Sequence, residues 1–172
     1  AYAGIYNVAF EVSQFVRSSR RAVDPIFGPM IAEQYGAGDR TRLAGTYARG
    51  VQWLLTINLL SFGVLVLAGE TVLRLYGAEY VPGYATLVIL AAAQAMNGAL
   101  GLSETVLLMA GRPGILFWNT VLLLAMVTGM VMVFINVWGI AGAATGLFLA
   151  ILFIAICQVF QVLKVAHIHP FN

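Results

Sequence analysis

The side chains best suited to binding chemistry lie between residues 7 and 24, on one side of a predicted helix. At about 100° of rotation per residue, five polar side chains share one narrow stripe and three charged ones lie beside it. The stripe holds Asn7, Glu11, Gln14, Ser18 and Arg21, and its flank holds Arg17, Arg20 and Asp24. A guanidinium group pairs well with phosphate or carboxylate oxygens, so this face of the helix can offer three cations to an anionic partner.

The opposite side of this helix is apolar, which makes the helix strongly amphipathic. One arginine at mid-bilayer costs about 2.5 to 3.5 kcal/mol, so three facing lipid would cost on the order of 9 kcal/mol. Three arrangements avoid this cost. The helix lines an aqueous cavity, which we favour; it lies flat in the headgroup region; or its charges pair internally, since Arg20 and Asp24 stand four residues apart.

The elements that position these residues follow from composition. The 172 residues are 61% hydrophobic and 9% charged, against about 25% charged in soluble domains. Two stretches, 51–69 and 80–103, carry no charge and are long enough to cross a hydrocarbon core. A third, 113–163, is far too long for one crossing and should fold back at Asn136–Gly139, where a polar residue, a tryptophan and a glycine meet.

The predicted fold class is therefore all-α, a polytopic transmembrane bundle that forms a single domain over residues 1–172. We expect about five membrane helices, over residues 4–35, 51–69, 84–110, 115–135 and 140–163. The first should bend near Pro25 and Pro29, because proline removes a helical hydrogen bond. Residues 70–83 should form an interfacial loop with tyrosine anchors.

Basic residues in the short connections predict the orientation of the bundle. One set of connections contains only Arg74, whereas the other contains Arg40, Arg42, Arg49, Arg112 and Lys164. Because lysine and arginine are retained on the cytoplasmic side, the segment 39–49, the turn 111–114 and the tail should be cytoplasmic.

Polar residues also occur in the third predicted span. Gln94, Asn97 and Glu104 either hold the bundle together by hydrogen bonds or line a cavity. Asn97 and Glu104 share a face, and Glu104 should lie near the cytoplasmic end of its helix. In the last helix, Gly142 and Gly146 form a GxxxG motif, which is typical of close helix packing.

Several function classes are not expected. The sequence has no Ser/His/Asp set, no Cys/His pair with metal-ligand spacing and no P-loop, so we predict neither an enzyme nor a cofactor. No metal site is expected, and His167 and His169 should be solvated in the tail. The net charge of +2 is too small and scattered for a nucleic-acid partner. Cys157 is a single cysteine in an apolar run, so it reads as a small buried side chain.

The order of short motifs resembles that of the polysaccharide biosynthesis/export flippases, which are lipid-linked oligosaccharide transporters of the MOP superfamily with a MATE-like fold. Gly4–Ala9 matches G-x-Y-x-x-A, and Pro29–Ala32 followed by Gly38-Asp39 matches P-x-(I/L)-(A/S)…G-D. Leu73–Tyr80 is similar to L-x-L-(F/Y)-G-x-x-Y. Gly111-Arg112 resembles the G-(R/K) turn, and Gly139–Ala144 the G-(I/V)-x-G-A-A hairpin.

The resemblance implies a carboxy-terminal lobe, whose partners would be the amino-terminal lobe of the same transporter, membrane lipid and a polyprenyl-diphosphate-linked glycan. It implies location in a bacterial inner membrane, in the family's orientation, which agrees with the arginine count. Under this reading the diphosphate would bind the three arginines, and the uncharged polar neighbours would assist: Arg17, Arg20, Arg21, Asn7, Gln14 and Ser18.

Two other functions remain open. A MATE-like antiporter of small molecules would use Glu11, Asp24 or Glu104 as proton or sodium sites, although the first helix has more arginines than acids. A non-transporting membrane scaffold would bury the polar stripe against protein, whereas a transporter would leave it facing an open vestibule.

Overall fold

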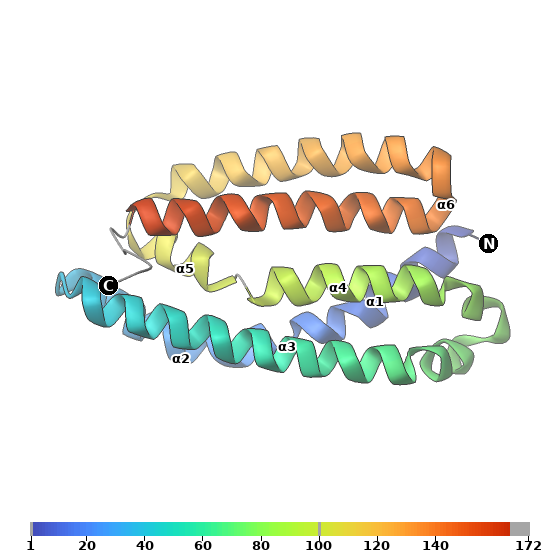
Figure 1. Cartoon of the computed structure of the whole chain (residues 1–172), viewed down its shortest axis with the longest axis horizontal. Coiled ribbons are helices and arrows are strands. Elements are labelled where there is room, and N and C mark those ends of the chain that lie inside the picture. The colour runs from blue at the N-terminus through green and yellow to red at the C-terminus, as the bar shows by residue number, and fades with distance from the viewer. Residues whose placement is uncertain (1, 100, 166–172) are drawn as a thin grey trace.

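The computed structural model describes residues 2–99 and 101–165, and every element in these two ranges is helical. This confirms the all-α fold class. The helices run side by side along the long axis of the molecule (Figure 1). In chain order they are α1 (Tyr2–Arg17), α2 (Ser19–Gly36), α3 (Arg40–Tyr76), the 3₁₀ helix η1 (Ala78–Gly83), α4 (Tyr84–Ala99), α5 (Gly101–Met109) and α6 (Pro113–Val165).

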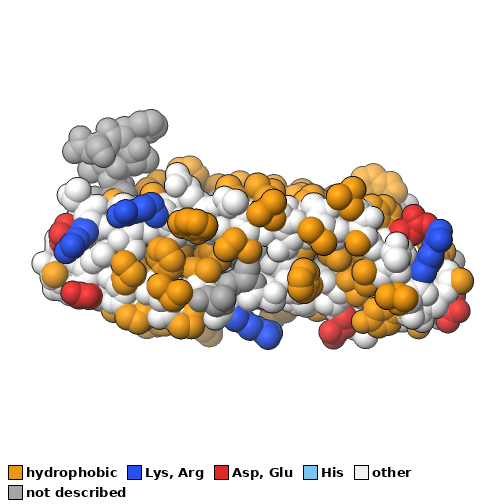
Figure 2. Space-filling model, turned by 90° about the horizontal axis from the view of Figure 1, so that it is seen from below, with side chains coloured by type: hydrophobic (Ala, Val, Ile, Leu, Met, Phe, Trp, Pro, Cys, Tyr) orange, Lys and Arg blue, Asp and Glu red, His pale blue; other side chains and the backbone are white. Residues whose placement is uncertain are grey.

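Three stretches are long and apolar enough to span a membrane, namely Arg40–Tyr76, Ala78–Met109 and Pro113–Val165. Large apolar side chains are exposed along them; Leu67 on α3 is 88% exposed and Trp118 on α6 is 69% exposed. On the face seen in Figure 2, hydrophobic side chains cover most of the length and most charged side chains gather towards the two ends. Apolar surfaces of this extent are unfavourable in water and are typical of helices that face the hydrocarbon core of a bilayer. The chain is therefore a helical membrane protein.

The long stretch α6 is a hairpin of two antiparallel helices, as the sequence predicted. It reverses at Gly139, whose φ of 60° and ψ of −135° are accessible mainly to glycine. Gly142 and Gly146 lie against the backbone of Phe134 and of Met130 in the first half of the hairpin, where a Cβ atom would clash. The GxxxG motif therefore packs the hairpin against itself.

The first predicted helix, residues 4–35, is divided at Ser18 and not at its prolines. The amide of Ser18 donates to Phe15 O and that of Arg21 donates to Ser18 O, both over 3.1 Å and both in the tighter i to i−3 pattern. Pro25 and Pro29 lie inside α2. Pro25 leaves the carbonyl of Arg21 without its usual i+4 amide, yet α2 continues through both prolines from Ser19 to Gly36.

Two other predicted boundaries also differ. The helix expected over 51–69 extends from Arg40 to Tyr76, because Asp39 caps its first turn by accepting from the amide of Arg42 over 3.0 Å. It therefore includes the basic stretch and part of the predicted 70–83 loop, of which η1 forms the rest. The helix expected over 84–110 is described on both sides of residue 100, as α4 up to Ala99 and as α5 from Gly101 to Met109. Charge-free stretches mark the hydrocarbon core, whereas helices continue into the headgroup region.

Two apolar clusters fill the described part of the bundle, one towards each end. The first joins α1, the second half of α3, α4 and α6 through buried residues such as Ala9, Val16, Leu87 and Ala144. The second joins α2, the first half of α3, α5 and the end of α6, through residues such as Ile31, Leu43, Leu102 and Val162. Between them lies the helix interruption after Arg17.

Candidate functional site

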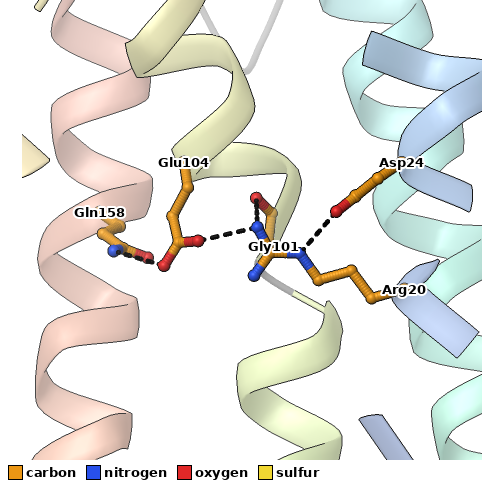
Figure 3. A network of polar contacts seen from close by, with 5 residues as sticks. All are labelled: Arg20, Asp24, Gly101, Glu104 and Gln158. Atoms are coloured by element: carbon orange, nitrogen blue, oxygen red, sulfur yellow. Dashed lines mark hydrogen bonds and ion pairs between the residues drawn. The ribbon is translucent and has the colours of Figure 1, made fainter. Parts of the chain in front are cut away.

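A network of charged and polar side chains fills the region between the two clusters, centred on Arg20 (Figure 3). Arg20 Nε donates to Asp24 Oδ2 over 2.9 Å within α2. Arg20 Nη2 donates to Glu104 Oε2 over 2.8 Å and to the carbonyl of Gly101 over 3.2 Å, both on α5. Glu104 Oε1 accepts from Gln158 Nε2 of α6 over 3.5 Å. One guanidinium thus connects α2 to α5, and Glu104 extends the connection to α6.

The missing side chain of Gly101 makes room for this arrangement. A Cβ atom at Gly101 would fall on the guanidinium group of Arg20, so only glycine allows the arginine to cross the start of α5. The Arg20 side chain is 15% exposed, whereas those of Asp24 and Glu104 are 36% and 38% exposed. Two carboxylates therefore compensate one buried cation, which is how a guanidinium becomes tolerable inside a bundle.

Beside the network lies a hollow of ≈ 450 Å³, here called the polar hollow. Every side chain that lines it is polar, and its residues come from α1, the Ser18 turn, α2 and α5. They are Gln14, Arg17, Ser18, Arg20, Arg21, Asp24 and Glu104. The structure therefore brings together seven of the nine predicted site residues, including Glu104, which is distant from the others in sequence.

The other two predicted residues lie apart from this hollow. Asn7 and Glu11 are exposed on α1, further towards its amino end, and line none of its walls. At 1.5 Å per residue, Asn7 lies about 10 Å and Glu11 about 5 Å from Gln14 along the helix axis, so both lie beyond the amino-terminal edge of the hollow. Periodicity predicts which face of a helix a residue occupies, but it does not predict how far along the helix a hollow extends.

The charges in the polar hollow are not equivalent. Arg20 is held by both carboxylates, whereas Arg17 and Arg21 form no ion pair with any residue that the structure describes. Asp24 Oδ1 is buried and has no hydrogen-bond partner there. The predicted pairing of Arg20 with Asp24 is confirmed. The guanidinium groups left to bind an added anion are those of Arg17 and Arg21.

Glu104 also lines a second, smaller hollow of ≈ 220 Å³ between α4, α5 and α6. Asn97 lines it too, which confirms that Asn97 and Glu104 share a face. Gln158 and Asn119 contribute from the two halves of α6. Next to it, Asn119 and Gln161 exchange two amide hydrogen bonds, of 2.7 and 2.9 Å. Gln94 is buried elsewhere, and its Oε1 atom has no hydrogen-bond partner among the residues that the structure describes.

Several polar contacts were not anticipated from the sequence. Gln158 and the Asn119–Gln161 pair hold α6 in place, and Tyr47 Oη lies 2.8 Å from Ser103 Oγ, joining α3 to α5. Their positions were nevertheless indicated by the sequence. Burying an amide or hydroxyl group in a strongly apolar run costs free energy unless the group forms a hydrogen bond, so such groups are expected to bind one another. Sequence alone did not say which ones would meet.

No group of three or more His, Cys, Asp or Glu residues that could hold a metal ion occurs within 2–99 and 101–165. His167 and His169 lie outside the described residues. Cys157 is a half-buried free thiol on α6.

No protein-family model, curated protein or solved structure shows significant similarity to this chain.

Proposed function

We propose that this chain forms one wall of the translocation cavity of a flippase, which moves a polyprenyl-diphosphate-linked oligosaccharide across a bacterial inner membrane by alternating access. The supporting observation is the polar hollow, which is lined wholly by polar residues inside a bundle of strongly apolar helices. In such a protein the diphosphate and glycan would occupy the wet side, and the polyprenyl tail would remain in lipid.

Within this proposal the arginines divide into two roles. Arg20 is a positioning residue, because its donors are directed to Asp24, Glu104 and Gly101. Arg17 and Arg21 bind the diphosphate, since they line the same hollow without an ion pair to the described residues. Gln14 and Ser18 line the hollow beside them and supply uncharged hydrogen-bonding groups.

The alternatives are less well supported by the same geometry. A MATE-like antiporter needs a carboxylate free to exchange a proton or sodium ion, yet Asp24 and Glu104 both accept from Arg20 and Glu11 lies outside the hollow. A scaffold would bury the polar stripe against a partner protein, so it predicts that Ser18 is shielded in the water-access experiment below. A flat interfacial helix would not pack α1 along α4 and α2 along α3 and α5, as here.

Water access tests the cavity. With Cys157 replaced by alanine, cysteines placed at Gln14 or Ser18 should react with a membrane-impermeant thiol reagent in proteoliposomes, because both positions line the polar hollow. A cysteine at Leu67, on the apolar face of α3, is the matched control and should stay unlabelled. Labelling at Ser18 no faster than at Leu67 would contradict the cavity.

A further inference from the structure

A second recognition site lies at the end of the bundle where α5 turns into α6. Two adjoining hollows open there, of ≈ 460 and ≈ 360 Å³, and both are lined by Arg112, Ile115 and Gln161. Trp118 contributes to the first hollow and Lys164 to the second. The polar hollow described above shares none of these residues.

Arg112 is held in a defined position by the turn. Its amide donates to Leu107 O over 3.1 Å and that of Gly111 donates to Leu108 O over 3.0 Å, which together form a Schellman motif around the positive φ of Gly111. The carbonyl of Arg112 in turn accepts from the amide of Ile115 over 3.1 Å. The backbone of the turn is therefore fixed, and the exposed guanidinium extends from it.

The wall between the two hollows is also rigid. Gln161 exchanges two amide hydrogen bonds with Asn119, which is 6% exposed. Lys164 lies in the last turn of α6, beside Leu163 and Val165, which pack on the same cluster as Ile115. Neither Arg112 nor Lys164 forms an ion pair with a residue of the two described ranges. Two cations thus border one concave site without a carboxylate partner in the described chain.

The surroundings indicate what kind of anion fits. Trp118 and Phe117 are 69% and 62% exposed on the side of α6 that begins at this turn. Tryptophan prefers the level of the lipid headgroups, and apolar side chains beyond it face acyl chains. Val121 and Leu122, three and four residues further from the turn than Trp118, are 41% and 42% exposed. A ligand that meets Arg112 and Lys164 at its head and these side chains at its tail must be amphipathic with an anionic headgroup.

We infer that the two adjoining hollows, which share Arg112 and Gln161 and are lined in addition by Trp118 and by Lys164 respectively, together bind the phosphate headgroup of one anionic bilayer phospholipid. The two cations pair with the phosphate oxygens, Trp118 lies beside the glycerol region, and the acyl chains continue along the exposed face of α6. The inference does not depend on the proposed transport function, because it concerns a different surface.

Each basic residue near an anionic surface contributes about 1 kcal/mol, so two predict roughly a 30-fold preference for an anionic over a zwitterionic phospholipid. Tryptophan fluorescence measures this directly. The exposed Trp53 and Trp138 are replaced by phenylalanine, which leaves Trp118 as the only reporter in the full chain. Brominated phosphatidylglycerol, titrated into phosphatidylcholine bilayers, should quench Trp118 at far lower mole fractions than brominated phosphatidylcholine.

Variants and controls separate this site from general attraction to the membrane. The double variant Arg112→Gln, Lys164→Gln should lose the preference, whereas Arg74→Gln, at the opposite end of the bundle, should keep it. A single-Trp138 protein, whose tryptophan lies beside the reversal of the α6 hairpin at Gly139, should show no preference. Equal quenching of Trp118 by the two lipids, or a preference that survives the double variant, would overturn the inference. Displacement by free inorganic phosphate would reassign the hollow to a soluble anion and would also overturn it.

Discussion

Arg20 Nη2 and Glu104 Oε2 lie 2.8 Å apart, and their ion pair joins α2 to α5 in the region between the two apolar clusters. The pair gives the three neighbouring arginines different roles. Arg20 links α2 to α5 through its ion pairs with Asp24 and Glu104. Arg17 and Arg21 line the polar hollow and form no ion pair with the described residues. Stability and transport should therefore respond to different substitutions.

The Arg20–Glu104 pair should contribute measurably to stability. Arg20→Gln and Glu104→Gln should each destabilise the protein in detergent by about 1 to 3 kcal/mol, below the value for fully buried pairs because Glu104 is partly exposed. The double variant should cost less than the sum, since each single variant leaves the other partner uncompensated. The same cycle on the exposed Arg74–Glu70 pair is the control and should give about 0.5 kcal/mol or less. Strict additivity at Arg20 and Glu104 would contradict their direct coupling.

Gly101 should be intolerant of any side chain. In Gly101→Val the new side chain occupies the position of the Arg20 guanidinium, so it should displace the arginine and lower the melting temperature at least as far as Arg20→Gln does. Gly129→Val is the matched control, because a Cβ atom there meets no neighbour within 4 Å. Melting curves followed by circular dichroism compare the two, and equal stability of both variants would be the contrary result.

The hairpin of α6 should depend on Gly142. Gly142→Leu places a side chain against the backbone of Phe134 and should destabilise the protein by about 1 to 3 kcal/mol, the usual range for overpacking. Gly129→Leu, on the open side of the same hairpin, should be nearly neutral. Chemical denaturation of the two variants in the same detergent measures the difference. If Gly142→Leu were as stable as Gly129→Leu, the close approach would not exist.

The two ends of the bundle should lie on opposite sides of the membrane. The turn that carries Arg112 and the end of α6 that carries Lys164 lie at one end, and Glu79 lies in η1 at the other (Figure 1). In a protein without Cys157, cysteines at 112 and 164 should be labelled from the cytoplasmic side and one at 79 from the outside, as the basic residues predict. Cytoplasmic labelling at position 79 would reverse the topology.

Much of the architecture was predictable because a helix that crosses the hydrocarbon core needs a long, uncharged and apolar run of residues. The length of the 113–163 apolar run required a reversal, and α6 turns at Asn136–Gly139, where a polar residue, a tryptophan and a glycine occur together. The exact helix ends were not predictable from charge. Arg40, Arg42 and Arg49 are fully compatible with a helix once Asp39 caps it, so a charged stretch does not mark a loop.

The site was predictable only where its residues share a helix. Helical periodicity placed Gln14, Arg17, Ser18 and Arg21 together, and they line one hollow. It also extended the stripe to Asn7 and Glu11, because periodicity predicts the face that a residue occupies and not how far along the helix the hollow extends. The contact between Arg20 and Glu104 joins segments more than 80 positions apart and depends on the missing side chain of Gly101. Periodicity within one helix contains no information about such contacts.

The central claim is that Arg17 and Arg21 bind the diphosphate of a lipid-linked glycan. It is tested most directly by flipping of a fluorescent polyprenyl-diphosphate glycan in proteoliposomes that contain the complete two-lobed transporter proposed here. The double variant Arg17→Gln, Arg21→Gln should abolish flipping while its melting temperature stays close to that of the parent, because neither arginine pairs with a described residue. The lysine double variant should recover part of the rate, since it keeps the charge but loses the paired hydrogen bonds. Flipping at the parent rate by the glutamine double variant, at equal protein content, would contradict the account.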